Sequence, residues 1–178
     1  MMLTFEVQDT WPPLAWLASC HAGETSMTIR HGPDVETRQN WFCEAVWDGQ
    51  FADGRFDRTG IVFGSRGRVN NDKTTFVSSS FVCDRLHSIC IGEDYYISNS
   101  LSCLAAVLDL HVDPWYPWYY EDISSIIDGP DDYKQELDTD RGPVQLTYYR
   151  NLTWDGRQLT ETDKPVDECP FDDFNSYR

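Results

Sequence analysis

The sequence predicts an α+β fold made of antiparallel β-hairpins with a few short helices. Three segments combine alternating apolar residues with turn residues, which is typical of hairpins, and two segments show helical spacing. The chain has 178 residues, enough for one domain with a single sizeable core. Hydrophobic residues form 40% of it and aromatic residues 14%, so its composition excludes disorder over most of its length.

Two strands are predicted in the first part of the chain. Residues 3–7 alternate between apolar and polar, and so do residues 40–48, where Glu44 is the one side chain out of place among apolar neighbours. A carboxylate in such a position is a candidate for a shifted pKa. A glutamate that reaches solvent from an edge strand is the commoner case, so we assign Glu44 no catalytic role.

A hairpin is predicted for residues 61–77, with its tip at Asn70-Asn71-Asp72. Inside it, Gly64-Ser65-Arg66-Gly67 has the composition of a phosphate-binding loop. The helix that should follow such a loop and its Lys-Ser/Thr pair are both missing, so we interpret these residues as a β-bulge.

The next segment predicts a hairpin followed directly by a helix. Residues 86–91 and 95–97 alternate around the turn Gly92-Glu93-Asp94. Ser98 or Ser100 can then cap a helix. Its apolar residues follow the spacing of one buried stripe, namely Leu101, Leu104, Ala105 and Leu108. The helix and the hairpin are therefore expected to share a core.

Aromatic residues concentrate in a proline-containing loop at residues 113–120, which leads into a short helix. The helix has four residues on one side, namely Tyr119, Ile123, Ile126 and Ile127. Two interpretations are open for the aromatic residues of the loop, Trp115, Tyr116, Trp118 and Tyr119: they form a patch that docks a partner or stacks a ligand, or they fill the core under the hairpins. We favour the core, because Trp and Tyr bury well when their polar atoms find partners.

A last hairpin is predicted around Asp155-Gly156, between residues 144–149 and 158–160. We place the domain at residues 1–161. Residues 162–178 contain prolines and acidic residues without an apolar period, and are expected to be an acidic tail or the start of a linker.

The charge of the chain limits its partners. The net charge is −16, and the part from Asp113 to Arg178 has 16 acidic and six basic residues. Nucleic acid is excluded as a partner, because phosphate binding needs clustered Lys and Arg. The acidity serves either solubility, which we favour, or binding to a basic partner. Without an apolar run of signal-peptide or membrane-spanning length, we expect no membrane partner and a cytoplasmic location.

Six cysteines are spaced irregularly among apolar neighbours, namely Cys20, Cys43, Cys83, Cys90, Cys103 and Cys169. This pattern favours reduced, buried thiols over disulfides. Because the chain has no Cys-x-x-Cys pair, we expect no zinc site, and nothing in the sequence predicts another cofactor or metal.

The order of elements around Asp84 resembles a known family. Cys83-Asp84-Arg85-Leu86 enters the hairpin, and Ser98-Asn99-Ser100-Leu101 opens the helix. This arrangement resembles the end of the class II glutamine amidotransferase domain of asparagine synthetases, although the Gly, Pro and Lys of the family pattern are missing. The resemblance covers about residues 40–110. It implies the Ntn-hydrolase fold, with stacked antiparallel β-sheets and a few flanking helices.

The same resemblance maps two binding positions, Asp84 and Arg85, which a salt bridge at the corner explains equally well. The fragment Arg30-His31-Gly32-Pro33-Asp34 is similar to a run in true synthetases, but we interpret it as a plain turn.

A working glutaminase of this class needs a cysteine as its first residue, because the thiol attacks and the α-amine of the same residue accepts the proton. This chain begins Met1-Met2, and the nearest thiol, Cys20, follows a predicted strand. The resemblance therefore implies a catalytically inactive domain with a structural or regulatory role in an asparagine-synthetase-like, ATP-dependent amide-forming system. The chain has no Ser-Gly-Gly-x-Asp-Ser loop, so a synthetase domain or subunit is the expected partner.

Two alternatives remain open. One is a cysteine-dependent amidase, with Cys20, Cys43 or Cys83 as nucleophile and His21 or His87 as base. Cys20 and His21 are neighbours in an extended segment, so their side chains point to opposite faces and cannot share a proton. The other alternative is a stand-alone acidic protein-interaction module, whose binding to a basic partner would weaken with salt.

Overall fold

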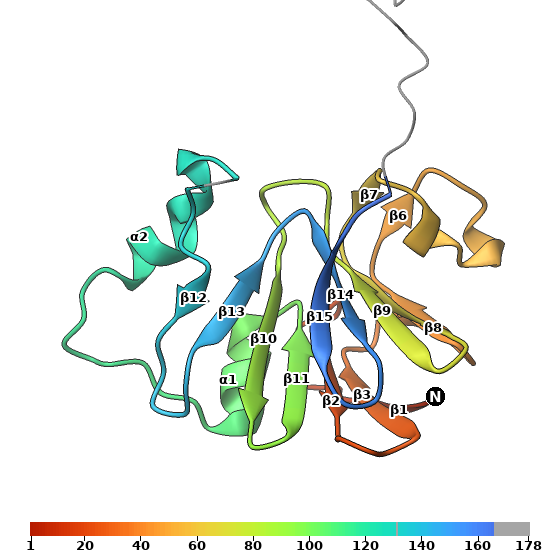
Figure 1. Cartoon of the computed structure of the whole chain (residues 1–178), viewed down its shortest axis with the longest axis horizontal. Coiled ribbons are helices and arrows are strands. Elements are labelled where there is room, and N and C mark those ends of the chain that lie inside the picture. Colours follow the sequence, from red (N-terminus) through yellow and green to blue (C-terminus); the bar gives the residue numbers. More distant parts are fainter. Residues whose placement is uncertain (131, 166–178) are drawn as a thin grey trace, which may run out of the picture.

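The protein is mostly β, with sheets of seven, six and two strands and two short α-helices in the part that the structure describes (Figure 1). The computed structural model describes residues 1–130 and 132–165. No helix among these residues has the length and apolarity needed to span a membrane.

The seven-stranded sheet has the order β1 (Met2–Val7), β3 (Ser26–His31), β2 (Trp16–Cys20), β11 (Asp94–Ser98), β10 (Leu86–Ile91), β13 (Val144–Thr147) and β12 (Glu136–Leu137). The six-stranded sheet has the order β15 (Leu159–Asp163), β14 (Arg150–Trp154), β9 (Lys73–Val77), β8 (Arg66–Asn70), β5 (Trp41–Cys43) and β4 (Glu36–Arg38). The third sheet pairs β6 (Val46–Trp47) with β7 (Val62–Phe63). Among the described strands, β1 and β3 pair in parallel and the other pairs are antiparallel.

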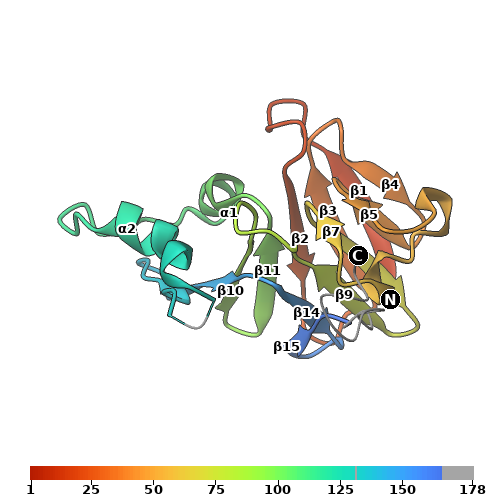
Figure 2. The ribbon, with the colours of Figure 1, turned by 90° about the horizontal axis from the view of Figure 1, so that it is seen from above.

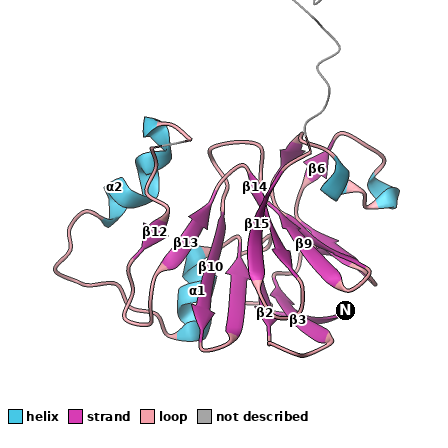
Figure 3. Cartoon of the chain, viewed as in Figure 1, coloured by secondary structure: helices cyan, strands magenta, loops and turns pink. Residues whose placement is uncertain are grey.

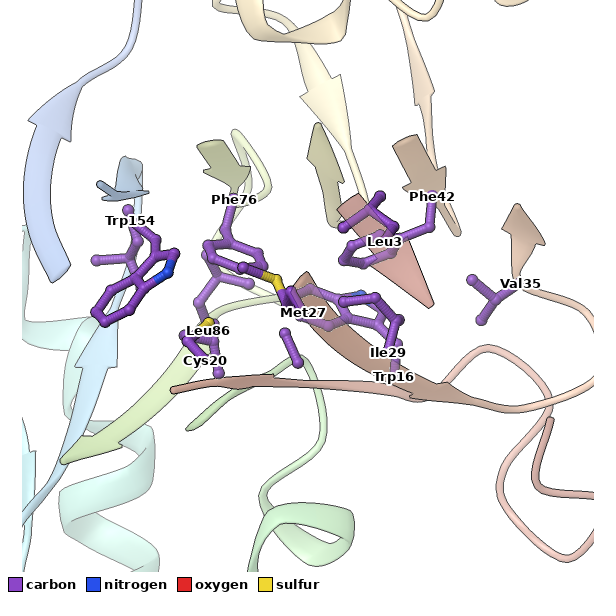
Figure 4. Packing of buried hydrophobic residues seen from close by; sticks show 13 residues of the cluster. Leu3, Trp16, Cys20, Met27, Ile29, Val35, Phe42, Phe76, Leu86 and Trp154 are labelled. Atoms are coloured by element: carbon purple, nitrogen blue, oxygen red, sulfur yellow. The ribbon is translucent and has the colours of Figure 1, made fainter. Parts of the chain in front are cut away.

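The main core lies between the two large sheets. Figure 4 shows Phe42, Phe76 and Trp154 of the six-stranded sheet facing side chains of the seven-stranded sheet. Trp16 is fully buried at the centre, with its ring 4.9 Å from that of Phe42 and stacked 6.0 Å from that of Phe76. Because both sheets contribute apolar side chains to this one cluster, the core holds the sheets together.

The helix α1 (Leu101–Leu108) covers the outer face of the seven-stranded sheet. Leu104 and Leu108 pack with Leu17 of β2 and Ile89 of β10 in a second cluster. The side chain of Ser100 caps the helix by accepting a hydrogen bond from the Cys103 N–H at 3.3 Å. The predicted hairpin at residues 86–97, the capped helix and their common core are therefore confirmed.

The cap predicts a measurable stability effect. Ser100→Ala is expected to lower the free energy of unfolding by about 1 kcal/mol, because an N–H at the start of α1 loses its acceptor. Urea titration followed by circular dichroism measures this. Ser102→Ala is the matched control, since Ser102 is exposed within the same helix and alanine is a better helix former. Equal losses for the two variants would contradict the capping role.

Residues 40–48 do not form one continuous strand, contrary to the prediction. The pairing of β5 with β8 stops at Cys43↔Arg66 and resumes between β6 and β7 at Val46↔Phe63, in the same register. Because the register is unchanged, the interruption adds no residue, which differs from the expected β-bulge. Two features at the point of interruption account for it. Gly64 has a φ of +84°, and the Glu44 side chain accepts a hydrogen bond from the Ser65 N–H.

Other predictions are partly corrected. The predicted hairpin at 61–77 consists of β8 and β9, turning at Asn71, while residues 62–63 form β7 in another sheet. The Asp155-Gly156 hairpin is confirmed, but its first strand is β14, which the sequence did not indicate. The strand β15 continues to Asp163, two residues past the predicted domain end. Residues 166–178 of the proposed tail lie outside the described residues.

Candidate functional site

An open cleft forms where the start of β2, the end of β5 and the end of β11 meet. It consists of two adjoining cavities of about 500 and about 510 Å³ that share four lining residues, namely Leu14, Asp34, Glu44 and Asp84. One cavity extends to apolar residues, Val46, Phe51 and Phe63, and the other to Pro12, Pro13, Arg85, Asn99 and Ser100. Four carboxylates line this cleft, because Glu36 joins the three shared ones.

The carboxylate of Glu44 is fixed in the cleft by three hydrogen bonds. Its Oε1 accepts from the Ser65 N–H at 2.5 Å, from the Ser65 hydroxyl at 2.6 Å and from the Asn99 amide at 3.3 Å. Burial raises the pKa of Glu44, and the nearby charge of Asp84 raises it further, against the hydrogen bonds from Ser65 and Asn99. Glu44 is therefore partly buried and held by hydrogen bonds in the cleft, outside the strands, rather than on an edge strand as expected, and its pKa is shifted as the sequence suggested.

The hydrogen bonds of Glu44 continue into the core. The Trp16 indole N–H donates to the Ser65 hydroxyl at 2.8 Å, and the Trp16 backbone N–H donates to the Asn99 side-chain oxygen at 2.8 Å. Asn99 also donates to the Leu14 carbonyl at 2.9 Å. Because Trp16 and Asn99 belong to the seven-stranded sheet and its α1 connection, this network joins the cleft to both sheets.

Glycine at two positions shapes the cleft. A Cβ on Gly64 would lie 2.6 Å from the Glu44 carbonyl oxygen and 2.8 Å from its Oε2. A Cβ on Gly32 would lie 2.2 Å from the Pro12 carbonyl oxygen and 2.5 Å from that of Pro13. Of the fragment at residues 30–34, Arg30 and His31 end β3 and the predicted turn follows at Gly32. Its close approach to Pro12 and Pro13 also shapes one wall of the cleft, which Asp34 lines.

A pH-dependent stability is expected from Glu44. Its folded-state pKa is raised above the ordinary value of 4.5, so its stabilising contribution is complete below that value and is lost as the pH rises through the folded-state pKa. Glu44→Gln cannot ionise and keeps an oxygen for Ser65 and Asn99. We expect this variant to gain melting temperature relative to the native chain near neutral pH, with a gain that shrinks toward pH 4.5. Thermal denaturation at both pH values tests this, and a gain that is constant with pH would contradict it.

Asp84 and Arg85 are separated by the structure. Asp84 lines both cavities, whereas Arg85 donates from Nε to His87 Nε2 at 3.1 Å and from Nη1 to the Ile123 carbonyl at 2.8 Å. Arg85 Nη1 also donates to the Tyr148 hydroxyl. In the described residues no salt bridge joins Asp84 to Arg85, so the expected corner salt bridge is wrong. Arg85 borders one of the two cavities, but its hydrogen bonds connect β10 to the α2 region, whereas Asp84 lines both cavities.

His87 is held neutral. Burial, together with the positive charge of Arg85, lowers its pKa to about 3. Its Nε2 accepts the hydrogen bond from Arg85, and its Nδ1 lies 3.3 Å from the Ser98 carbonyl, to which it donates. Both ring nitrogens are occupied, so His87 is not available as a general base.

Two of the three cysteines proposed as nucleophiles, Cys20 and Cys43, are unsuited to nucleophilic attack. Burial raises the pKa of both Cys20 and Cys43, which keeps them protonated, and the thiolate is the nucleophile. Cys103 is buried too, but Cys83 and Cys90 are exposed, contrary to the expectation that all are buried. Within residues 1–130 and 132–165, no hydrogen bond or ion pair links a cysteine to a histidine, and His21 pairs with Asp94 at 2.9 Å. Cys169 lies outside the described residues.

A buried cation, Arg66, lies close enough to the cleft residues Cys43 and Glu44 to interact with them electrostatically. The Arg66 guanidinium has no exposed surface and is held 4.7 Å from the Trp47 ring centroid and 4.8 Å from that of Phe56. Burial lowers its pKa to about 10, and the nearby groups of Cys43 and Glu44 raise it. Arg66 therefore stays charged at neutral pH and is out of reach of any ligand. No group of three or more His, Cys, Asp or Glu side chains in the described chain could hold a metal ion.

The aromatic loop residues divide into two pairs. Trp115 is 90% exposed and Trp118 is 57% exposed, so filling of the core is wrong for both. Tyr116 and Tyr119 are partly buried and pack edge to face at 4.9 Å, with Tyr119 against the second core cluster. The short helix forms as α2 (Tyr119–Ser124) and a 3-10 turn (Ser125–Asp128), but Ile127 on its predicted buried side is 84% exposed.

The fold and the cleft define a mostly-β protein of two stacked sheets with an acidic, apolar-rimmed cleft at one end of the strands. No family model, curated protein or solved structure matches the chain.

Proposed function

We propose that this protein is a catalytically inactive, glutamine-amidotransferase-like module that serves the assembly of an asparagine-synthetase-like amide-forming system. The observation that carries the proposal is the continuous order of Asp84, hairpin and capped α1, set on two stacked and largely antiparallel sheets. This is the order and architecture that the resemblance implies. The Ntn-hydrolase fold and the synthetase partner are parts of this proposal.

The position of the cleft supports the proposal. The resemblance maps a binding position of the family onto Asp84, which lines both cavities and shares one of them with Asn99 and Ser100. Asn99 belongs to the segment that corresponds to the helix opening of the family, and it also holds Glu44 in place. The matching residues therefore gather around one cavity.

The state of the nearby thiols supports an inactive module. Cys43 lines the cleft, but it is buried with a raised pKa. Of the two histidines suggested as bases, His87 is neutral with both ring nitrogens hydrogen-bonded, and His21 pairs with Asp94. An amidase needs a thiolate within reach of a base, and the described cysteines and histidines do not provide one.

A glutamine hydrolysis assay tests the inactive role. We expect the purified chain to release no ammonia from L-glutamine above the buffer rate, and Cys43→Ser to behave identically. Ammonia release that Cys43→Ser or Cys20→Ala abolishes would contradict the proposal and favour the amidase. Affinity purification of the tagged chain from its native cells tests assembly, and we expect it to retain a protein with a pyrophosphate-binding Ser-Gly-Gly-x-Asp-Ser loop.

A second candidate is a free-standing acidic interaction module. It is favoured by the exposed aromatic residues of the α2 region and by the net charge of −16. The two candidates differ in the partner retained on affinity purification, because a free-standing module requires no synthetase.

A further inference from the structure

Large apolar side chains are exposed together on one short segment of the chain. We call residues 112–128 the aromatic segment. Its exposed apolar residues are Val112 (44% exposed), Trp115 (90%), Trp118 (57%), Tyr120 (78%) and Ile127 (84%). The segment includes α2, which lies at the left end of Figure 2, beside the β12 edge of the seven-stranded sheet, and its helices are the cyan coils at the upper left of Figure 3. A tryptophan at 90% exposure contributes almost nothing to folding, so the fold does not explain it.

Local hydrogen bonds hold the aromatic segment in shape. The Asp113 N–H donates to the Tyr119 hydroxyl at 2.8 Å, and the Trp115 N–H donates to the Asp113 carboxylate at 2.9 Å. Tyr119 packs onto the second core cluster, which attaches the segment to the seven-stranded sheet. Trp115 therefore projects from an ordered backbone, and a partner that covers it would lose little conformational entropy in the protein.

Exposed acidic residues are frequent in the aromatic segment and in the residues that follow it. The exposed acidic residues of positions 112–140 are Asp113, Glu121, Asp128, Asp132, Glu136, Asp138 and Asp140. Lys134 is the one Lys or Arg among the described residues of this stretch, and its ammonium pairs with Asp122 at 2.6 Å and lies 5.3 Å from the Tyr116 ring centroid. Of the acidic residues, Asp140 pairs with His111 at 3.2 Å. The exposed surface therefore combines apolar rings with an excess of negative charge.

We propose that the aromatic segment docks a basic, amphipathic segment of a partner protein, which rests on the assembly role proposed above. Apolar side chains of the partner cover Trp115 and Trp118, and its Arg or Lys side chains face the surrounding carboxylates. Arginine suits this surface best, because its guanidinium can stack on an indole ring and pair with a carboxylate at the same time. Tryptophan and tyrosine are also the residues that most often dominate binding energy at interfaces.

The negative charge of the aromatic segment disfavours nucleic acid and a second copy of the chain as ligands of this surface. A nucleic acid would bring phosphates against carboxylates, with no cluster of cations to receive them. A second copy of the chain would bring a net charge of −16 against the same acidic surface. A basic partner is the one for which the charges of both surfaces attract.

A binding assay with a defined peptide tests the proposal. The probe is a fluorescently labelled amphipathic helical peptide of Leu, Ala and Arg, measured by anisotropy with the full chain at low salt. We expect Trp115→Ala/Trp118→Ala to weaken binding about 10-fold or more, because two anchor side chains are lost while the net charge is unchanged. Met2→Ala/Val7→Ala is the control, since it removes two exposed apolar side chains, 64% and 56% exposed, from β1, which does not line the cleft. It should change the affinity less than about twofold.

Two further peptides separate the contributions of charge and apolar contact. A peptide with Ser in place of Leu and a peptide with Glu in place of Arg should each bind more weakly than the probe. Binding of the probe should also fall as salt rises. Melting temperatures equal to that of the native chain establish that both double variants fold.

Several outcomes would overturn the proposal. Equal affinity of the native chain and Trp115→Ala/Trp118→Ala would mean that general acidity attracts the peptide. A dimer in sedimentation that this variant dissociates would assign the surface to a second copy. The glutamine hydrolysis assay tests the inactive role separately. Ammonia release would contradict the inactive role without changing the difference in peptide affinity between the native chain and Trp115→Ala/Trp118→Ala. Equal peptide affinities would contradict the docking proposal without changing the result of the glutamine assay.

Discussion

Replacing Trp16 with alanine is expected to cost about 4 kcal/mol of unfolding free energy, in the range measured for large aromatic residues in cores. The side chain is fully buried between the sheets and packs against Phe42 and Phe76. Its indole N–H also donates a hydrogen bond to the Ser65 hydroxyl. A domain of this size has only about 5–15 kcal/mol of stability, so Trp16→Ala should shift the urea midpoint to a much lower concentration.

Two variants show whether position or residue type causes this loss. Trp115→Ala removes an indole that is 90% exposed and should change the free energy of unfolding by less than about 0.5 kcal/mol. Trp16→Phe keeps an aromatic ring but removes the hydrogen bond to Ser65, and should cost about half as much as alanine. Similar losses for Trp16→Ala and Trp115→Ala would refute the packing shown between the sheets.

Gly32→Ala is expected to cost about 3 kcal/mol, more than most single-methyl additions. The new Cβ would lie 2.2 Å from the Pro12 carbonyl oxygen and 2.7 Å from the Pro13 carbonyl carbon, and both atoms belong to the backbone. The Gly32 N–H also donates to the Ala15 carbonyl at 2.8 Å, so the two segments cannot separate without losing this bond. Thermal denaturation measures the loss, and the intrinsic fluorescence of Trp11 and Trp16, which flank the displaced segment, should change with it.

The glycine control is Gly92→Ala. Gly92 has a φ of +67°, and a Cβ added there would meet no other atom. Alanine at this position is therefore disfavoured only by its backbone conformation, which should lower the free energy of unfolding by about 1 kcal/mol. Gly32 is not in the left-handed region, so its larger cost would come from steric contact. If Gly32→Ala is no more costly than Gly92→Ala, the close approach of the two segments is wrong.

The sequence predicted the elements whose signals are local. The hairpin of β10 and β11 and the cap at Ser100 follow from alternation and residue type within a few positions. The strand β14 was missed because it buries Asn151 next to Leu152, so its pattern does not alternate. The break after Cys43 was missed because it depends on a hydrogen bond between Glu44 and Ser65, 21 positions apart.

The candidate site could be predicted only in part. A single carboxylate in an apolar strand pointed to Glu44, but its partner Asn99 is 55 positions away, and only the stacking of the sheets brings them together. Asp84 and Arg85 are neighbours in sequence, and no pattern indicates that Asp84 lines both cavities while Arg85 borders only one of them and binds the Ile123 carbonyl. The exposure of Trp115 was predicted wrongly, because residue type alone favours burial.

The path of the chain between the two large sheets has a consequence for how the protein reaches its native state. Residues 2–31 and 86–147 build the seven-stranded sheet, and residues 36–77 and 150–163 build the six-stranded one. Neither sheet can be completed by one contiguous stretch, so the pairing β2–β11 must close a long loop before it gains any stability. Folding on the order of milliseconds to seconds is expected of such non-local topologies. A fragment cut between the strands would lack part of both sheets. The domain can therefore be expressed or fused to another protein only as a whole.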